Sequence, residues 1–464
     1  MTAFPRVPHT GRAALITLAS SALFAVSAPA HTGSLRLGQE PPPVPTWLVV
    51  MTGGGVIGMS FLFASLVTDH DLIEEINARR LGVGTSDRLE RVVVWAAGWA
   101  SVLLLVATVG VGLFGPEDPR TNAAVVFVWA GWWAGYTATV YVIGNSWPAL
   151  NPWRTIADAI PVEASRSLPA QLGPWPAVVG LLGLIWLEVV APVGSDPQLL
   201  AIVVVGYTLL TVAGAVTVGS DEWFDRVDPI ARVFRCYGRI APVQRAWSGL
   251  ELRLPGAAAT DRSDDADVEP VFVIAVLWAT TFDGLVSTPA WRGATEPIVG
   301  LGVPPRLVYL LAIAIGFGGF LGLYRLGARL VRRTGQTYLG ERAVADAFAT
   351  SLLPIAAGYH AAHFLAYVIS LLPALAVLAA NPLSPPAAVP VLTIPGWFGA
   401  LGLLFILLGH VLAIWIAHSI AFDCFTGRLQ PLRSQYPLVA LMIAYTMTSM
   451  WIVIQPTVEV PFLA

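Results

Sequence analysis

Ten long apolar stretches constrain what this chain of 464 residues can fold into. Each has about the 20 residues that an α-helix needs to cross the hydrocarbon core of a bilayer. The stretches occupy residues 46–67, 91–114, 123–144, 175–193, 198–219, 270–289, 306–328, 350–379, 396–421 and 436–456. We therefore predict an all-α, polytopic membrane helix bundle of about ten transmembrane helices, whose main partner is the lipid bilayer.

The composition supports this class and excludes others. Hydrophobic residues make up 56% of the chain and charged residues 12%, whereas a typical soluble domain has about 25% charged residues. There is no lysine, and the net charge is -3, so the chain lacks the basic surface that binding to nucleic acid requires. The two cysteines, Cys236 and Cys424, are far apart in sequence and do not suggest a disulfide framework.

The first 30 residues have the pattern of a secretory signal peptide. Arg6 and Arg12 precede an apolar core at residues 13–27, and Ala28-Pro29-Ala30 fits a small-x-small cleavage site. We predict a signal peptide over 1–30 and a mature chain, 31–464, that begins at His31 on the outside of the membrane. An uncleaved first helix is the alternative.

Arginine gives a topology that agrees with this start. Basic residues collect in cytoplasmic loops, and the loops predicted to be inside hold 20 arginines against four outside. We therefore expect a multi-pass protein of the plasma membrane with both mature termini outside and the arginine-rich loops in the cytoplasm. The largest of these loops, 220–269, mixes Trp, Phe and Ile with Arg in its first half, which predicts a helix along the inner surface. Its second half is acidic and predicts a mobile segment.

Six carboxyl or imidazole side chains lie within the predicted spans: Glu188, Asp283, His360, His363, His410 and His418. Such residues are rare in membrane helices and usually face the bundle interior, where they mark functional sites. A purely structural interpretation remains open, because imidazoles also bind helices together through hydrogen bonds.

The histidines suggest a metal site. His360 and His363 are three residues apart, so they share a face of one helix, and His410 lies in the next span beside Gly409, which allows close helix approach. One register of these helices places the three imidazoles at similar depth, where they would resemble a catalytic zinc or copper site. His418 is eight residues beyond His410, about 12 Å along the helix axis, which is too far for the same ion.

Asp283 stands in the stretch T-T-F-D-G, residues 280–284. Two threonines and a glycine beside a carboxylate suggest a polar cavity and an irregular helix. Asp283 would serve as a metal ligand, a general base or a proton acceptor, or it would simply pair with a histidine. Glu188 is a weaker candidate, because it lies close to the outer end of its span.

These residues carry a resemblance to a known family. The stretches T-T-F-D-G, S-L-L-P-I-A-A-G-Y-H-A-A-H-F (351–364), G-H-V-L-A-I-W-I-A-H (409–418) and S-Q-Y-P-L-V-A-L-M-I-A-Y-T (434–446), with N-P-W-R (151–154), resemble prokaryotic polytopic membrane proteins labelled fenitrothion hydrolase. The resemblance implies a membrane-bound hydrolase of organophosphate triesters. Relatives have a small or apolar residue in place of His360, so the resemblance gives more weight to His363 and His410.

Three hypotheses about function follow. The first is a metal-dependent membrane hydrolase, in which His360, His363 and His410 hold a zinc-like ion that activates water and Asp283 acts as base or further ligand. The second is a transporter or assembly factor for a transition metal such as copper, which uses the same residues as a relay; ligands at several depths, from His31 outside to His418 inside, would favour it. The third is a structural membrane protein without a metal.

Overall fold

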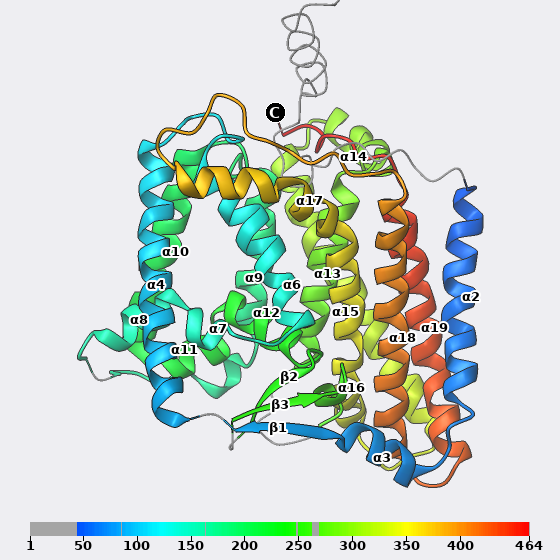
Figure 1. Ribbon diagram of the computed structural model, residues 1–464. Helices are drawn as coiled ribbons and strands as arrows, with labels where there is room; N and C mark the ends of the chain where they lie inside the picture. Colours follow the sequence, from blue (N-terminus) through cyan, green and yellow to red (C-terminus); the bar gives the residue numbers. More distant parts are fainter. Residues whose placement is uncertain (1–43, 85, 163, 247–248, 262–268, 464) are drawn as a thin grey trace, which may run out of the picture.

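The computed structural model describes residues 44–84, 86–162, 164–246, 249–261 and 269–463. The predicted signal peptide and His31 lie outside these residues. The described chain is almost entirely helical, and its helices run side by side as an all-α bundle (Figure 1). This confirms the predicted fold class.

Eight helical segments of the described chain are long and apolar enough to cross a membrane. They are α2 (Thr46–Ala64), α4 (Asp87–Phe114), the run of α5 (Ala123–Val126), η1 (Phe127–Tyr136) and α6 (Thr137–Val142), α10 (Pro197–Val218), α15 (Pro305–Gly335), the run of α16 (Glu341–Ala349), η4 (Thr350–Leu352) and α17 (Leu353–Ala380), α18 (Phe398–Cys424) and α19 (Leu429–Val453).

The other two predicted spans are helical but differ from simple membrane-crossing helices. The fourth, α9 (Trp175–Val190), has 16 residues, which gives a length of about 24 Å against the roughly 30 Å of a hydrocarbon core. The sixth, α13 (Pro270–Val286), is followed by α14 (Pro289–Gly300) after a bend of 83°. Counting this pair as one span gives up to nine spans in the described chain.

The helices form two groups that meet at α13 and α17 (Figure 1). In one group, α19 packs against α2, α15 and α18. In the other, α4 packs against α10 and against α8 (Pro152–Ala159). Helix α17 joins the two, because it packs against α18 on one side and against η1 on the other. Its C-terminal part, gold in Figure 1, extends across the upper end of the bundle toward α4 and α10.

A small antiparallel sheet closes one end of the bundle, which we call the sheet end. Strands β1 (Arg80–Gly84), β2 (Val243–Ala246) and β3 (Gly249–Arg253) are arranged in the order β1-β3-β2. These strands were not predicted from the sequence. They lie beside α3 (His70–Ala78), which an Asp69 side chain caps by accepting hydrogen bonds from the first backbone N–H groups.

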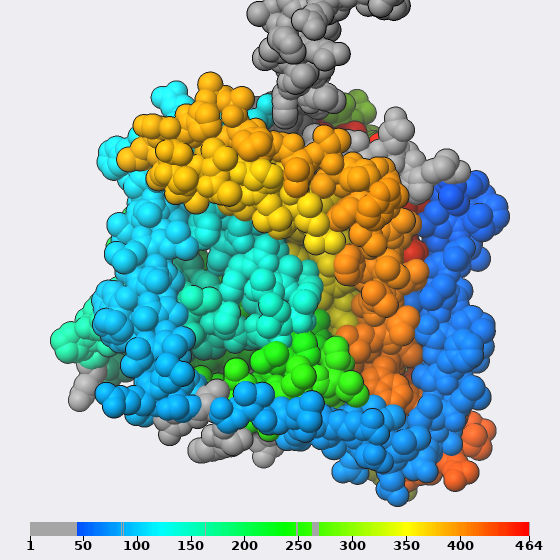
Figure 2. All heavy atoms as spheres, viewed as in Figure 1, coloured from blue at the N-terminus to red at the C-terminus, as the bar shows by residue number. Residues whose placement is uncertain are grey.

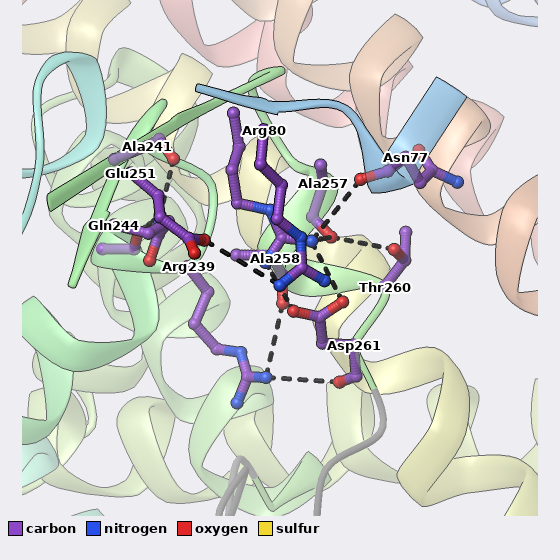
Figure 3. A network of polar contacts seen from close by, with 12 residues as sticks. Asn77, Arg80, Arg239, Ala241, Gln244, Glu251, Ala257, Ala258, Thr260 and Asp261 are labelled. Carbon is purple, nitrogen blue, oxygen red and sulfur yellow. Dashed lines mark hydrogen bonds and ion pairs between the residues drawn. The ribbon is translucent and has the colours of Figure 1, made fainter. Parts of the chain in front are cut away.

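Buried Arg253 organises the polar network at this end, shown from close by in Figure 3. Its guanidinium donates to both carboxylate oxygens of Asp261, with the longer bond at 3.1 Å, and to the carbonyl oxygens of Asn77 and Ala257. Arg239 donates to the carbonyl oxygen of Asp261. These contacts join α3, β3 and the short helix η3 (Ala257–Ala259).

The segment 220–269 differs from the predicted surface loop. It forms α11 (Ser220–Arg226) and α12 (Pro229–Gly238), and α12 is buried through almost its whole length against α9 and α6. The prediction of a helix was correct, and α12 packs into the protein, because Ile230, Val233 and Phe234 belong to the main hydrophobic core. In the acidic second half, Asp261 is ordered by Arg253, and residues 262–268 lie outside the described residues.

The remaining short elements connect these helices. They are α7 (Trp147–Leu150) and the 3-10 helix η2 (Ala170–Leu172).

Candidate functional site

Two ionisable side chains from different helices meet inside the bundle. The Nε2 atom of His363, on α17, lies 3.0 Å from the Oδ2 atom of Asp283, on α13. Their side chains are 2% and 15% exposed, so little water competes for the contact. An imidazole and a carboxylate at this distance form an ion pair when the imidazole is protonated. Of the roles that the sequence left open for Asp283, the structure contains the pairing with a histidine.

A glycine lets an aromatic side chain close over this pair. Tyr359 stacks on the ring of His363 at a centroid distance of 6.0 Å. A Cβ atom at position 284 would lie 1.9 Å from the Tyr359 hydroxyl oxygen, so only glycine fits there. The glycine of T-T-F-D-G therefore permits close contact between α13 and α17 rather than an irregular helix.

Helix α13 is continuous through Asp283 to Val286, and the irregularity of this span is the 83° bend that follows. The hydroxyl of Thr280 donates to the carbonyl oxygens of Val276 and Leu277, and that of Thr281 donates to Leu277. The threonines thus bond to their own helix, as hydroxyls of membrane helices commonly do. Their bonding gives no sign of the polar cavity that the sequence suggested.

His360 has aromatic surroundings. Its Nδ1 atom lies 3.2 Å from the hydroxyl of Tyr141, and its ring contacts those of Trp133 and Tyr237 at centroid distances of 6.4 and 6.2 Å. Phe364 lies beside both histidines of α17, 4.7 Å from each ring. His360 and His363 therefore flank one aromatic ring, and different polar groups fix the two imidazoles.

His410, on α18, is completely buried. Its Nδ1 atom lies 2.8 Å from the carbonyl oxygen of Ile406, one turn earlier. Because a carbonyl can only accept, Nδ1 carries the proton, and Nε2 of the neutral ring carries the lone pair. Within the described part of the chain, this Nε2 atom has no hydrogen-bond partner. It is the ring nitrogen that could bind a cation.

The crossing of α17 and α18 sets the relative depth of the histidines. A Cβ atom on Gly358 would lie 3.2 Å from the Gly409 Cα atom and 2.5 Å from the carbonyl oxygen of Phe405, so the predicted close approach at Gly409 exists. The two helices are antiparallel and cross at Gly358 and Gly409. His363 lies five residues after Gly358, toward one end of the bundle, and His410 lies one residue after Gly409, toward the opposite end. At 1.5 Å per residue, the two differ in depth by about 9 Å.

This offset bears on the predicted metal site. The described residues contain no group of three or more His, Cys, Asp or Glu side chains that could hold a metal ion. Catalytic zinc sites have three protein ligands. The structure brings two candidate ligands together, His363 and Asp283, and His360 lies one helical turn away. This arrangement therefore does not fit a resident three-imidazole centre, and a metal at His360, His363 and His410 stays a prediction.

The other two carboxyl or imidazole side chains of the spans are also buried. His418 is fully buried near the sheet end, where Nε2 lies 2.8 Å from the carbonyl oxygen of Val67 and Nδ1 lies 3.3 Å from Gln435. These contacts join α18 to α19 and to the segment after α2. Glu188 is 8% exposed and lines an apolar cavity beside α9.

The comparisons with known proteins give no name for this arrangement. No family model, curated protein or solved structure matches the chain. The resemblance to proteins labelled fenitrothion hydrolase therefore stays a prediction.

A π-helix next to the site was not predicted. η1, Phe127–Tyr136, reads F-V-W-A-G-W-W-A-G-Y, and its Trp133 contacts His360. π-helical segments are rare and frequent at functional sites. The sequence signal was the cluster of tryptophans and glycines, but periodicity does not distinguish a π-helix from an α-helix over ten residues.

Proposed function

We propose that this protein is a membrane transporter for a transition-metal cation, in which His363 and Asp283 form the central binding station. The observation that supports it is a series of buried imidazoles at successive depths on two adjacent helices. His410 lies about 9 Å from the level of His363, and His418 lies about 12 Å further toward the sheet end. This is the arrangement that distinguishes a relay from a single catalytic centre.

The number of ligands at each level also favours transport. A cation that must pass through has to bind strongly enough to enter and weakly enough to leave, and several sites with few ligands meet both needs. Two protein ligands, His363 and Asp283, would bind an ion more weakly than a closed four-ligand site. The lone pair on Nε2 of His410 would offer one further ligand along the path.

The donor types indicate which cation would be carried. Imidazole suits zinc and copper, and a carboxylate adds a negative charge that reduces the energy needed to bring a cation into the membrane. A metal binds the deprotonated imidazole and carboxylate, so binding at His363 and Asp283 would release protons. Movement toward the sheet end would be import if the arginine-rich loops face the cytoplasm, as the sequence predicts.

Metal analysis of the purified protein tests this proposal. The wild type, brought to equilibrium with Zn²⁺ or Cu⁺ by dialysis, is expected to retain metal in excess of the dialysis buffer, and His363→Ala and His410→Ala are expected to retain less. His70→Ala is a matched control, because His70 is an exposed histidine at the sheet end. No retained metal in the wild type, or equal retention in all four proteins, would contradict the proposal.

A second candidate is a hydrolase, which one contact favours. A carboxylate that holds an imidazole at 3.0 Å is the arrangement of a general base and its orienting partner in nucleophilic hydrolysis. A phosphate triester with a chromogenic leaving group, diethyl 4-nitrophenyl phosphate, tests it in proteoliposomes. Hydrolysis by the wild type that is lost in His363→Gln would support the enzyme, and no hydrolysis above that of empty liposomes would reject it.

A further inference from the structure

Two adjoining apolar cavities lie between α4, η1, α9 and α10. Their volumes are about 140 Å³ and about 240 Å³. They share four wall residues, which join them into one hollow: Val128, Trp132, Trp153 and Val204. Trp133, whose ring contacts His360, is part of the same wall.

The lining does not suit water. It consists mainly of tryptophan, leucine and valine side chains from these four helices and from α7, α8 and α12, and Glu188 is its one acidic or basic residue among the described residues. Apolar cavities of this kind stay dry. An empty one is also unfavourable, because the atoms of its walls lose their dispersion contacts. A hydrocarbon chain would restore the dispersion contacts of the walls and would need no hydrogen bonds.

The hollow lies among membrane-crossing segments, where lipid hydrocarbon can reach it. Three of the four walls belong to segments that can cross a membrane, namely α4, the α5–η1–α6 run and α10. The space-filling view shows the surface hollowed between α4 and the η1–α6 region (Figure 2). In a bilayer, the fluid at this surface is lipid hydrocarbon.

We infer that this cavity is a binding site for one acyl chain of a membrane phospholipid, which enters between α4 and η1. Along α10 the wall extends from Leu200 to Tyr207, which is about 10 Å of helix axis. The chain would therefore lie along the bundle axis. This inference does not depend on the proposed transport of a cation.

One polar group indicates where the ester end of the lipid would lie. Trp147 is 5% exposed and lines the larger cavity. Its indole Nε1 has no hydrogen-bond partner within the described chain. Trp147 follows the span that ends at Val142, so it lies where a membrane interface would be, the usual depth of tryptophan side chains. The ester end of the lipid would therefore lie at the level of Trp147.

A pair of neighbouring valines tests the inference. Val204 lines both cavities, whereas Val205 is 37% exposed on the lipid side of the same helix. Val204→Trp should fill the cavity, and Val205→Trp adds the same side chain outside it. The probe is phosphatidylcholine with a diazirine on one acyl chain, reconstituted with each protein, photolysed and mapped by peptide mass spectrometry.

We expect the wild type and Val205→Trp to be labelled at Trp132 or at the Leu200–Tyr207 wall, and Val204→Trp to lose at least 80% of that labelling. A free fatty acid with the same diazirine, added in a second arm, should label these positions less than the phospholipid does. Equal wall labelling in the two variants, or none in the wild type, would overturn the inference. Stronger labelling by the free acid would reject a phospholipid occupant.

A second measurement distinguishes a filled cavity from misfolding of Val204→Trp. Lipid-facing Leu209, which is 67% exposed on α10, should be labelled to the same extent in all three proteins. A second cavity-filling variant, Leu104→Trp on α4, should repeat the loss of wall labelling. If Leu104→Trp keeps full labelling of the wall while Leu209 is labelled normally, the cavity is not the acyl-chain site.

Discussion

Removing either side chain of the His363–Asp283 pair should destabilise the bundle, and the two losses should be coupled. The perturbation is a double-mutant cycle with Asp283→Ala, His363→Ala and the double variant. The contact is 3.0 Å long, and the side chains are 2% and 15% exposed. Double-mutant cycles on close charge pairs give coupling free energies of about 1.5–7 kcal/mol, whereas neutral interhelical hydrogen bonds in membranes average about 0.6 kcal/mol.

We expect a coupling free energy of about 2 kcal/mol, because a close charge pair that is nearly dry is screened little by water and salt. The free energy of unfolding can be measured by titrating the protein in dodecyl maltoside micelles with sodium dodecyl sulfate, with intrinsic tryptophan fluorescence as the signal. A matched control cycle combines Asp283→Ala with His410→Ala, whose side chains the structure places at different depths. Its effects should add to within about 0.5 kcal/mol.

Two results would refute this reasoning. A coupling free energy below about 0.5 kcal/mol would mean that the two side chains act independently. An equal coupling in the control cycle would mean that the effect spreads through the bundle and does not come from the contact.

Three further predictions follow from single positions. Gly358→Leu should destabilise the fold by more than the roughly 1–3 kcal/mol of ordinary overpacking, because its Cβ atom would lie 2.5 Å from a backbone carbonyl; Gly318→Leu, in open space on α15, is the control in a thermal unfolding assay. Burial raises the pKa of the Cys236 thiol to about 11, so N-ethylmaleimide at pH 7.5 should leave Cys236 unmodified in the folded protein, and mass spectrometry that finds it alkylated before unfolding would contradict this. Burial also raises the pKa of the Asp228 carboxyl from 3.8 to about 6. The folded state therefore holds this proton more tightly than the unfolded chain does. The contribution of this proton to the free energy of unfolding is fully present below pH 4 and is lost as the pH rises through 6. The Tm of the wild type should therefore fall more between pH 5 and pH 8 than that of Asp228→Asn, and an equal fall in both would count against this.

The sequence was enough to predict the class of fold. Ten apolar stretches predicted ten helices, and each of these stretches is helical. Length and composition do not reveal how a helix ends, however, so the short α9 and the 83° bend after α13 were not foreseen. The sheet was missed for a related reason: Arg80–Gly84 and Gly249–Arg253 are far apart in sequence, and their pairing depends on tertiary contacts.

The candidate site was predicted in part. The rarity of ionisable residues in the spans identified Asp283 and His363, and the structure brings them into contact. The sequence could not give the register of α17 against α18, which the glycines at 358 and 409 set. That register is what separates His410 in depth from the other two imidazoles.

The buried surroundings of His360 were also out of reach. They depend on Tyr141, which is 219 residues away in sequence, and on a π-helix that the apolar pattern does not distinguish from an α-helix. The same π-helix forms a wall of the apolar cavity. Only tertiary contacts place the histidine and the cavity on either side of one tryptophan, Trp133.

Metal flux into proteoliposomes tests the central claim most directly. Purified protein is reconstituted around a trapped fluorescent indicator, and Zn²⁺ and Cu⁺ are added outside in separate experiments. We predict uptake by the wild type for one of these ions, a rate at least tenfold lower in Asp283→Asn and His363→Gln, and an unchanged rate in Glu188→Gln, which alters another buried carboxyl of the bundle. Uptake no faster than in protein-free liposomes, or equal uptake by the wild type and Asp283→Asn, would contradict the account.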